Sequence, residues 1–351
     1  MATIGDVARL AEVSPSTVSY VISGKRPISA PTRRRVEKAI AELGFRPHAG
    51  ARALASLRTD VIGLMAPLRS GVDVHVIMQF VAGVVTAAGR SGYDVLLLTQ
   101  EEGSVARAGS ASMVDGLVVM DVERDDPRLP DLRAMRQPSV LIGLPADPQG
   151  LSCVDLDFVR AGGLAARTLL EAGHRSLALV ASPPEVLHRH TTYAERMASG
   201  FTEACRAAGA SSLVLATEAS VAGAVRSVDA LLAASPPVTG VVVHNEVALA
   251  HVLSRLRERG RSVPQDLSVV AVCPQDVAAA LPSPVTSVDI PAEGIGRIAV
   301  EMLIALLREP GLAEVRLVSP RLQERGSVLP PAGAAADDVV GAAAPPGPAT
   351  P

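Results

Sequence analysis

The sequence is poor in aromatic residues and in cysteine, and it lacks a long uncharged apolar run. Aromatics make up 2% of its positions and tryptophan is absent, so the cores must be built mainly from Ala, Val and Leu. The three cysteines are far apart and without metal-ligand spacing, which predicts neither a disulfide framework nor a metal site. With no apolar run of about 18 residues and no basic-then-apolar N-terminus, we expect a cytoplasmic protein without a membrane span.

Length and charge point to a modular chain. At 351 residues and 48% hydrophobic composition, it is long enough for two or three globular cores. The net charge of −3 conceals an asymmetry, because residues 1–58 carry ten Lys or Arg against four acids, a charge of +6, and the remainder carries −9. A basic N-terminal part on an acidic body is expected where one end of a protein attracts phosphate.

Two short amphipathic helices are predicted at the N-terminus. The first follows Thr3, which forms a capping-box pattern with Asp6 and precedes apolar residues at i, i+3, i+4 and i+7. The second begins after Ser14, with Pro15 in its first turn, and ends at Gly24. Its packing face consists of Val18, Val21 and Ile22. The two helices meet across the short turn Glu12-Val13-Ser14. This arrangement predicts a helix-turn-helix, whose second helix enters the DNA major groove.

A third helix is predicted over residues 30–43, with Ser29 as its cap and Gly44 as its stop. Its buried stripe is expected to consist of Val36, Ala39, Ile40 and Leu43. Residues 3–58 as a whole resemble the DNA-binding headpiece of the lactose-repressor (LacI/GalR) family. The matching blocks are Thr3-Ile4-Gly5-Asp6-Val7-Ala8, Val13-Ser14-Pro15-Ser16-Thr17-Val18-Ser19, Ile28-Ser29 with Thr32-Arg33, and Leu43-Gly44-Phe45-Arg46-Pro47.

The resemblance implies that the headpiece contacts double-stranded operator DNA. The expected contact residues are Thr3, Ser14, Pro15, Ser16, Thr17, Ser19, Tyr20, Ser29, Arg33, Arg52 and Leu54. Among them Pro15, Ser16 and Tyr20 would read bases, although Tyr20 without a base contact is the alternative. Residues 47–58 correspond to a hinge helix that folds on the operator and inserts Leu54 into the minor groove; a plain linker is the alternative.

Beyond residue 60, short apolar runs alternate with amphipathic stretches, which predicts parallel sheets covered by helices on both faces. Expected strands are 61–65, 95–98, 116–120, 139–142, 177–180, 241–243 and 267–271. Expected helices are 76–88, 159–172, 194–207, 246–259 and 292–307. The resemblance adds a two-lobed periplasmic-binding-protein-like fold with chain crossings near Asp157, Asp289 and Pro320.

The expected fold class is therefore an all-α helix-turn-helix headpiece followed by an α/β two-lobed effector domain. The predicted domains are the DNA-binding headpiece at 1–46, the hinge at 47–58, the effector-binding and dimerisation domain at 59–330, and a disordered tail at 331–351. The tail is rich in Ala, Pro and Gly, and it has no leucine heptads that would form a coiled coil.

Two blocks that match the family predict an effector site. Arg196 lies in a block whose Arg binds ligand in the family, and a planar guanidinium suits hydroxyls or a carboxylate; an interlobe salt bridge is the alternative. Asn245 and Glu246 stand where the family has an Asn-Asp pair at the end of a strand, and Asn245 supplies the donor and acceptor that sugar recognition needs. The alternative is that Asn245 caps the following helix and Glu246 belongs to its first turn.

A third block departs from the family. Cys273 stands where a ligand-binding Asp is common, so the effector need not be a simple hexose. Asp121 and Asp157, which follow predicted strands, are candidates to compensate, with a capping or turn role as the alternative.

These features predict a transcriptional regulator, and more specifically a repressor, that binds a palindromic operator as a homodimer under control of a small-molecule effector, for which a sugar is the first choice. A transport-type sugar-binding protein is the alternative. We expect no cofactor and no enzymatic activity, because the sequence lacks a Gly-x-Gly-x-x-Gly fingerprint, a phosphate loop and a Gly-x-Ser-x-Gly elbow.

Overall fold

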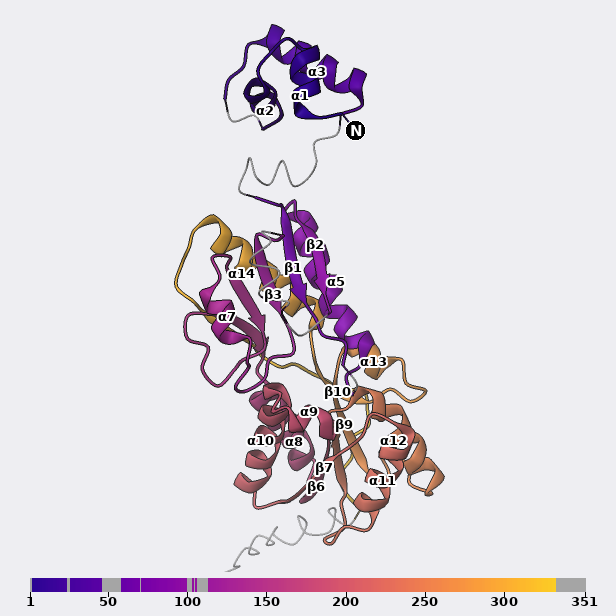
Figure 1. Ribbon diagram of the computed structural model, residues 1–351. Coiled ribbons are helices and arrows are strands. Elements are labelled where there is room, and N and C mark those ends of the chain that lie inside the picture. Colours follow the sequence, from indigo (N-terminus) through magenta and orange to yellow (C-terminus); the bar gives the residue numbers. More distant parts are fainter. Residues whose placement is uncertain are drawn as a thin grey trace, which may run out of the picture.

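The computed structural model describes residues 2–23, 26–45, 58–69, 71–99, 103, 105 and 113–332. Three helices form a separate N-terminal headpiece: α1 (Ile4–Leu10), α2 (Pro15–Ser23) and α3 (Ala30–Leu43) (Figure 1). Their apolar faces meet around Val7, Val18 and Val36, which are fully buried. The predicted helix-turn-helix is thus present, with the third helix packed on both of its members.

The first lobe is built on a parallel six-stranded sheet with the order β11-β5-β4-β3-β1-β2. Its strands are β1 (Val61–Met65), β2 (Asp94–Leu98), β3 (Gly116–Val119), β4 (Ser139–Ile142), β5 (Ser152–Leu156) and β11 (Val315–Val318). Helices α5 (Val74–Arg90) and α14 (Ala292–Arg308) cover one face, and α7 (Leu129–Ala134) contributes to the other. Both faces are apolar because both are covered.

The second lobe repeats this plan with the strand order β12-β10-β9-β8-β6-β7, in which only β12 is antiparallel to its neighbour. Its strands are β6 (Ser176–Ala181), β7 (Ser211–Ala216), β8 (Gly240–Val243), β9 (Ser268–Cys273), β10 (Thr286–Asp289) and β12 (Leu322–Gln323). Its large helices are α8 (Phe158–Glu171), α10 (Thr192–Ala207), α11 (Val221–Leu232) and α12 (Glu246–Glu258), and its short ones are α9 (Pro184–His188) and α13 (Gln275–Ala279). Along β8, Val242 packs toward α8, while Val241 and Val243 join the core beneath α11 and α12.

The chain passes between the two sheets three times. After β5 it enters α8, which packs on the second sheet, and after β10 it returns in α14 to the first. After β11 it crosses again to form β12. These crossings lie next to Asp157, Asp289 and Pro320, as the family resemblance implied.

Each lobe contains one helix pair in unusually close contact, and glycines make the contact possible. A Cβ added to Gly200 in α10 would overlap the carbonyl oxygen of Val159 in α8, and one added to Gly162 would overlap the carbonyl oxygen of Met197. The same reciprocal arrangement, through Gly83 and Gly296, joins α5 to α14 in the first lobe. The backbones of both pairs therefore approach more closely than any side chain would allow.

Two local predictions for α3 are wrong. Ser29 stands at the cap position, but its hydroxyl pairs with that of Thr32 at 2.9 Å and does not bond the helix backbone. Leu43 is 37% exposed and lies outside the headpiece core, because the helix ends one residue later at the left-handed Gly44. In the part of the chain that the structure describes, no helix is long and apolar enough to span a bilayer.

Candidate DNA-binding headpiece and interlobe cavity

The start of α2 leaves its side chains free for contact. Ser14 caps the helix, since its Oγ accepts the Thr17 backbone N–H at 3.2 Å and pairs with the Thr17 hydroxyl at 2.9 Å. The next two residues, Pro15 and Ser16, are exposed, while Ser19 is partly buried. The first turn of α2 therefore presents small side chains outward from a rigid cap, as a helix that reads a groove must do.

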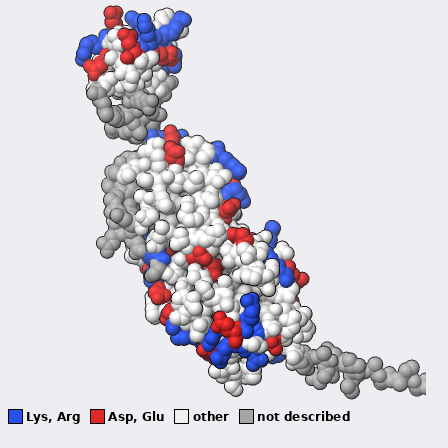
Figure 2. Space-filling view, turned by 90° about the vertical axis from the view of Figure 1, so that its right-hand side faces the viewer, with Lys and Arg blue, Asp and Glu red and all other residues white. Residues whose placement is uncertain are grey.

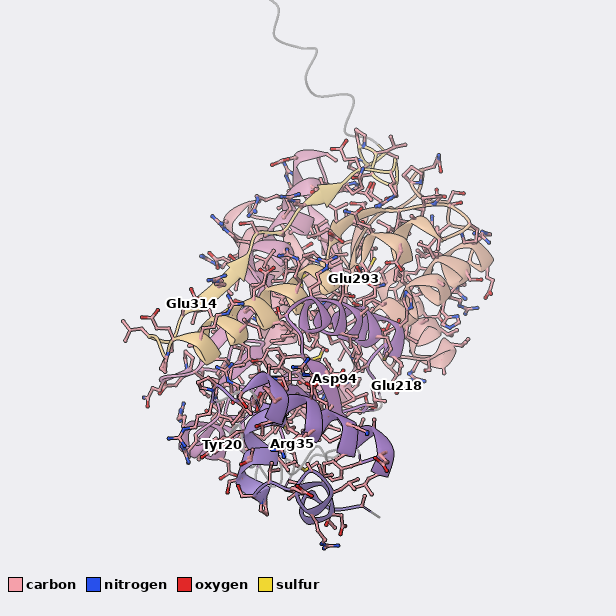
Figure 3. All side chains as sticks on the ribbon, turned by 90° about the horizontal axis from the view of Figure 1, so that it is seen from above. Tyr20, Arg35, Asp94, Glu218, Glu293 and Glu314 are labelled. Carbon is pink, nitrogen blue, oxygen red and sulfur yellow. The ribbon has the colours of Figure 1, made fainter. Side chains whose placement is uncertain are left out.

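Tyr20 lies on the same helix with its ring partly exposed, and it is labelled in the view from above (Figure 3). The guanidinium of Arg26 sits over this ring, 5.5 Å from its centroid. This cation–π contact holds a positive charge beside the phenol. A cation and an aromatic ring therefore lie side by side on the headpiece.

Of the other predicted DNA contacts, some lie in the described headpiece and some lie outside the described residues. Thr3 completes the predicted capping box of α1, because its Oγ1 accepts the Asp6 N–H at 3.2 Å and Asp6 Oδ2 accepts the Thr3 N–H at 2.9 Å. Arg33 is partly buried at the start of α3. Arg52, Leu54 and the helix stop Gly24 lie outside the described residues, as does most of the predicted hinge and tail.

A cavity lies between the two lobes, where the carboxyl ends of β1, β3, β8 and β10 come together. It encloses about 120 Å³, and one water needs about 10–15 Å³ on such a measure, so a ligand on the order of ten heavy atoms fits. Its walls are mainly apolar, with a few polar groups set among them. An open α/β sheet binds ligands at this edge.

Asp121 reaches the cavity from the end of β3. Its backbone is left-handed, with φ of 56°, a conformation that Asp tolerates better than most residues. Its carboxylate pairs with Arg69 at 3.0 Å and with Arg189 of the second lobe at 2.7 Å. Asp121 therefore lines the cavity and also joins the two lobes.

Arg196 is placed in the interlobe salt bridge that was the alternative reading, and it is not part of the cavity wall. Its guanidinium binds Asp155, which projects from β5 of the first lobe, and lies 5.6 Å from the centroid of the Phe158 ring. Asp155 does line the cavity. Burial raises the pKa of Asp155 to about 6, even though Arg196 opposes that shift.

Asn245 and Glu246 both line the cavity at the end of β8. Asn245 is 4% exposed and caps α12, since its Oδ1 accepts the Ala248 N–H at 3.1 Å and its Nδ2 donates to the Thr217 carbonyl at 2.7 Å. The capping role of Asn245 is thus realised. Glu246 is the first residue of α12, and burial, with a smaller effect of nearby Asp73, raises its pKa to about 7.

Cys273 and Asp157 do not line the cavity. Cys273 is 1% exposed and, with Val269 and Ala271 of β9, packs in the core on the α12 side of the sheet, opposite the side that α8 covers. Asp157 caps α8 by accepting the Arg160 N–H at 3.1 Å. All three cysteines are buried and unpaired, as expected.

Sequence reasoning missed an aromatic wall of the cavity. The rings of Phe158, Tyr193 and His244 contact one another, with centroids 5.5–5.8 Å apart. His244 is 4% exposed, and burial lowers its pKa to about 4, so its imidazole is neutral near pH 7. Its position directly before Asn245, at a strand end, was the available signal. Asp73, which caps α5 at the cavity, was missed as well.

A helix-turn-helix headpiece joined to a two-lobed α/β domain with an interlobe cavity defines a class of ligand-responsive DNA-binding proteins. Comparison with known proteins agrees: residues 3–48 match "Bacterial regulatory proteins, lacI family" and residues 148–328 match "Periplasmic binding protein-like domain". The chain is 32% identical to the HTH-type transcriptional regulator CelR of Thermobifida fusca over 335 residues, covering 90% of this chain and 95% of CelR. The protein belongs to the LacI family of transcriptional regulators.

Solved structures show the same architecture. The transcriptional regulator CelR–cellobiose complex superposes with a TM-score of 0.65 at 28% identity, covering 93% of this chain and all of that one. The lac repressor dimer bound to operator and the anti-inducer ONPF superposes with a TM-score of 0.77 at 22% identity, covering 93% and 99% of the two chains, which supports the fold.

Proposed function

We propose that this protein represses transcription by binding a palindromic operator as a homodimer, and that a small sugar in the interlobe cavity controls the binding. The observation that carries the proposal is the combination, in one chain, of an exposed capped α2 with a cavity walled by both lobes. The first provides DNA recognition. The second provides a ligand site whose occupation favours one arrangement of the lobes.

The DNA contacts would come from the headpiece. Headpiece and hinge together, residues 1–58, carry a charge of +6, which attracts phosphates without regard to sequence. Pro15, Ser16 and Tyr20 would then read base edges in the major groove, with Arg52 and Leu54 of the hinge acting in the minor groove. Thr3, Ser14, Thr17, Ser29 and Arg33 would hold the helices in register on the DNA backbone.

The homodimer is supported by an apolar stripe on α5. Val74, Met78 and Val85 recur on one side of this helix and are 45–51% exposed. Figure 2, which looks at the side where α5 lies in Figure 1, shows few charged side chains over the first lobe. A second copy that covers this face would bring two headpieces to the two halves of an inverted repeat.

The effector role is supported by the cavity and by the similarity to the solved CelR–cellobiose complex. Arg189–Asp121 and Arg196–Asp155 join the lobes directly beside the cavity walls. A ligand that binds one lobe arrangement more tightly changes the spacing of the paired headpieces. The difference in affinity for the two arrangements is the coupling free energy.

The test is selection of operator fragments from genomic DNA by the full chain, followed by footprinting. We expect protection of an inverted repeat. Tyr20→Ala should weaken binding to the selected duplex, relative to random duplex, by about 5- to 150-fold, since one base contact is worth about 1–3 kcal/mol. Arg90→Ala, which removes an exposed charge on the first lobe, is the matched control. A chain with no preference for any inverted repeat would instead be a sugar-binding protein of transport type.

A further inference from the structure

The cavity is acidic. Four carboxyl groups line it, from Asp73, Asp121, Asp155 and Glu246, and none of the described lining residues is Lys or Arg. Two of these acids are neutralised by cations that stand behind the wall: Asp121 by Arg69 and Arg189, and Asp155 by Arg196. A ligand with a phosphate or carboxylate would therefore meet negative charge with no exposed cation to bind it.

The remaining two acids come from opposite lobes, and both line the cavity. Asp73 caps α5 of the first lobe, where Oδ1 accepts the His75 N–H at 2.8 Å. Glu246 opens α12 of the second lobe, and the charge of Asp73 makes its ionisation harder. Among the described residues neither carboxylate has an ion-pair partner in either lobe. A positive charge placed between them would compensate both at once.

His244 is a second, independent sign of a ligand. Its side chain is 4% exposed and lines the cavity, yet neither ring nitrogen has a hydrogen-bond partner among the described residues. The neutral ring offers one donor and one acceptor. The ring nitrogens do not belong to the fully buried, unpartnered polar atoms of the described residues, so they open to the cavity, where a ligand or water can bond them. Beside it, the rings of Phe158 and Tyr193 present an aromatic surface that favours a cation or the apolar face of a sugar.

We infer that the cavity binds a small amino sugar, with its protonated amine between Asp73 and Glu246 and a neighbouring hydroxyl on His244. This inference rests on the proposed function, because it names the chemical class of the effector. A neutral sugar would satisfy the hydrogen bonds but would bring no counter-charge to the two cavity acids. An amine supplies the charge as well as the donors.

The experiment is calorimetric titration of the full chain near neutral pH with matched ligands. Glucosamine, galactosamine and mannosamine are each compared with glucose, galactose and mannose and with their N-acetyl derivatives, which keep the ring and remove the charge. We expect at least one amine to bind about tenfold or more tightly than its hydroxyl and N-acetyl partners, because a hydrogen bond to a charged group exceeds a neutral one.

Variants assign the effect to the two carboxylates. Glu246→Gln and Asp73→Asn keep size and hydrogen bonding, and Asn preserves the cap of α5. Each should remove the preference for amine over hydroxyl. Asp94→Asn, an exposed acid at the start of β2 (Figure 3), makes the same charge change outside the cavity and should leave the preference intact.

Two results overturn the inference: no amine binds better than its neutral partners, or the preference for the amine survives in either cavity variant. An operator-binding assay, first without ligand and then with each sugar, distinguishes failure of the amino-sugar inference from failure of the proposed function. If a neutral sugar alters operator binding and the amines do not, the repressor assignment stands and the amino-sugar inference falls.

Discussion

Glu246 illustrates how single residues of the cavity oppose folding. Burial raises its pKa from 4.5 to about 7, so the folded protein holds the proton more tightly than the unfolded chain does. Protonation of Glu246 therefore stabilises the folded state as the pH falls from about 7 toward 4.5. Above pH 7 the ionised, buried carboxylate lowers the free energy of unfolding by its full amount. A residue that destabilises the empty protein is expected where ligand supplies the missing partner.

Glu246→Gln should therefore stabilise the protein without ligand at pH 8, by about 1–3 kcal/mol. Most of the gain should disappear at pH 5, where the side chain is protonated in the folded wild type. Urea unfolding at the two pH values measures the difference, with Glu171→Gln at the exposed end of α8 as the control. An equal gain at both pH values would show that ionisation is not its cause.

Residue roles could be read from the sequence where the partner is local. The Thr3–Asp6 box, the Ser14 cap and the Gly44 stop depend on neighbours three or four positions away. Arg196 and His244 could not be placed this way, because Asp155 lies 41 residues before Arg196 and only the fold brings them together. The prediction that Cys273 binds ligand was wrong for the same reason. Whether its side chain reaches the cavity or the core depends on packing between distant segments.

At the scale of elements, the tight helix pairs are the feature on which each lobe depends. Because Gly162 and Gly200 face backbone in the partner helix, no side-chain rotation can make room for a larger residue. The α8–α10 pair carries Phe158 and Tyr193 to the cavity wall. A change in this crossing therefore alters both stability and the shape of the site.

Gly200→Ala should destabilise the protein by about 1–3 kcal/mol, because overpacking forces the two backbones apart. Gly89→Ala is the matched control: Gly89 lies in α5 with nothing within 4 Å of an added Cβ, so better helix propensity should raise stability by up to about 1 kcal/mol. Thermal and urea unfolding of both variants measures the contrast. Two variants of the same sign would contradict the packing explanation.

Most long helices and most buried strands were predictable; the helix α11 and the polar or exposed strands were not predicted. β1 and β4 were predicted at their observed bounds because continuous apolar runs identify strands covered on both faces. β5 was missed because Asp155 interrupts its apolar run, and the edge strand β7 because it alternates and is largely exposed. β10, β11 and β12 are short, and pairing with distant strands defines them.

At the scale of the whole molecule, the lobes are also joined at the outer rim of the cleft. His75 of α5 pairs with Asp276 of α13 at 2.9 Å, and Gln79 donates to the same carboxylate at 3.0 Å. The hydrogen bond to Asp276, helped by the charge of Asp73, raises the pKa of His75. This contact therefore stabilises the joined lobes below the ordinary His pKa of 6.5 and weakens as the pH rises through the raised value.

The joined arrangement should accordingly be more populated at pH 6 than at pH 8, and Asp276→Asn should reduce that pH dependence, leaving the part that comes from ionisation of Glu246 in the same cleft as Asp73. Energy transfer between dyes on the two lobes reports the population. Glu301→Gln breaks a surface pair with Arg297 inside α14, so it tests for a general charge effect. A pH response unchanged in Asp276→Asn would exclude the His75 contact as its origin.

The strand order has a consequence for synthesis on the ribosome. β11 completes the first sheet and β12 the second, and both are encoded after residue 314. Until that part of the nascent chain emerges, the backbone groups along one side of β5 and of β10 have no strand to pair with. A stop codon before the codon for Val315 would thus leave an unpaired strand edge in each sheet. We expect its product to be a substrate for chaperones and proteases.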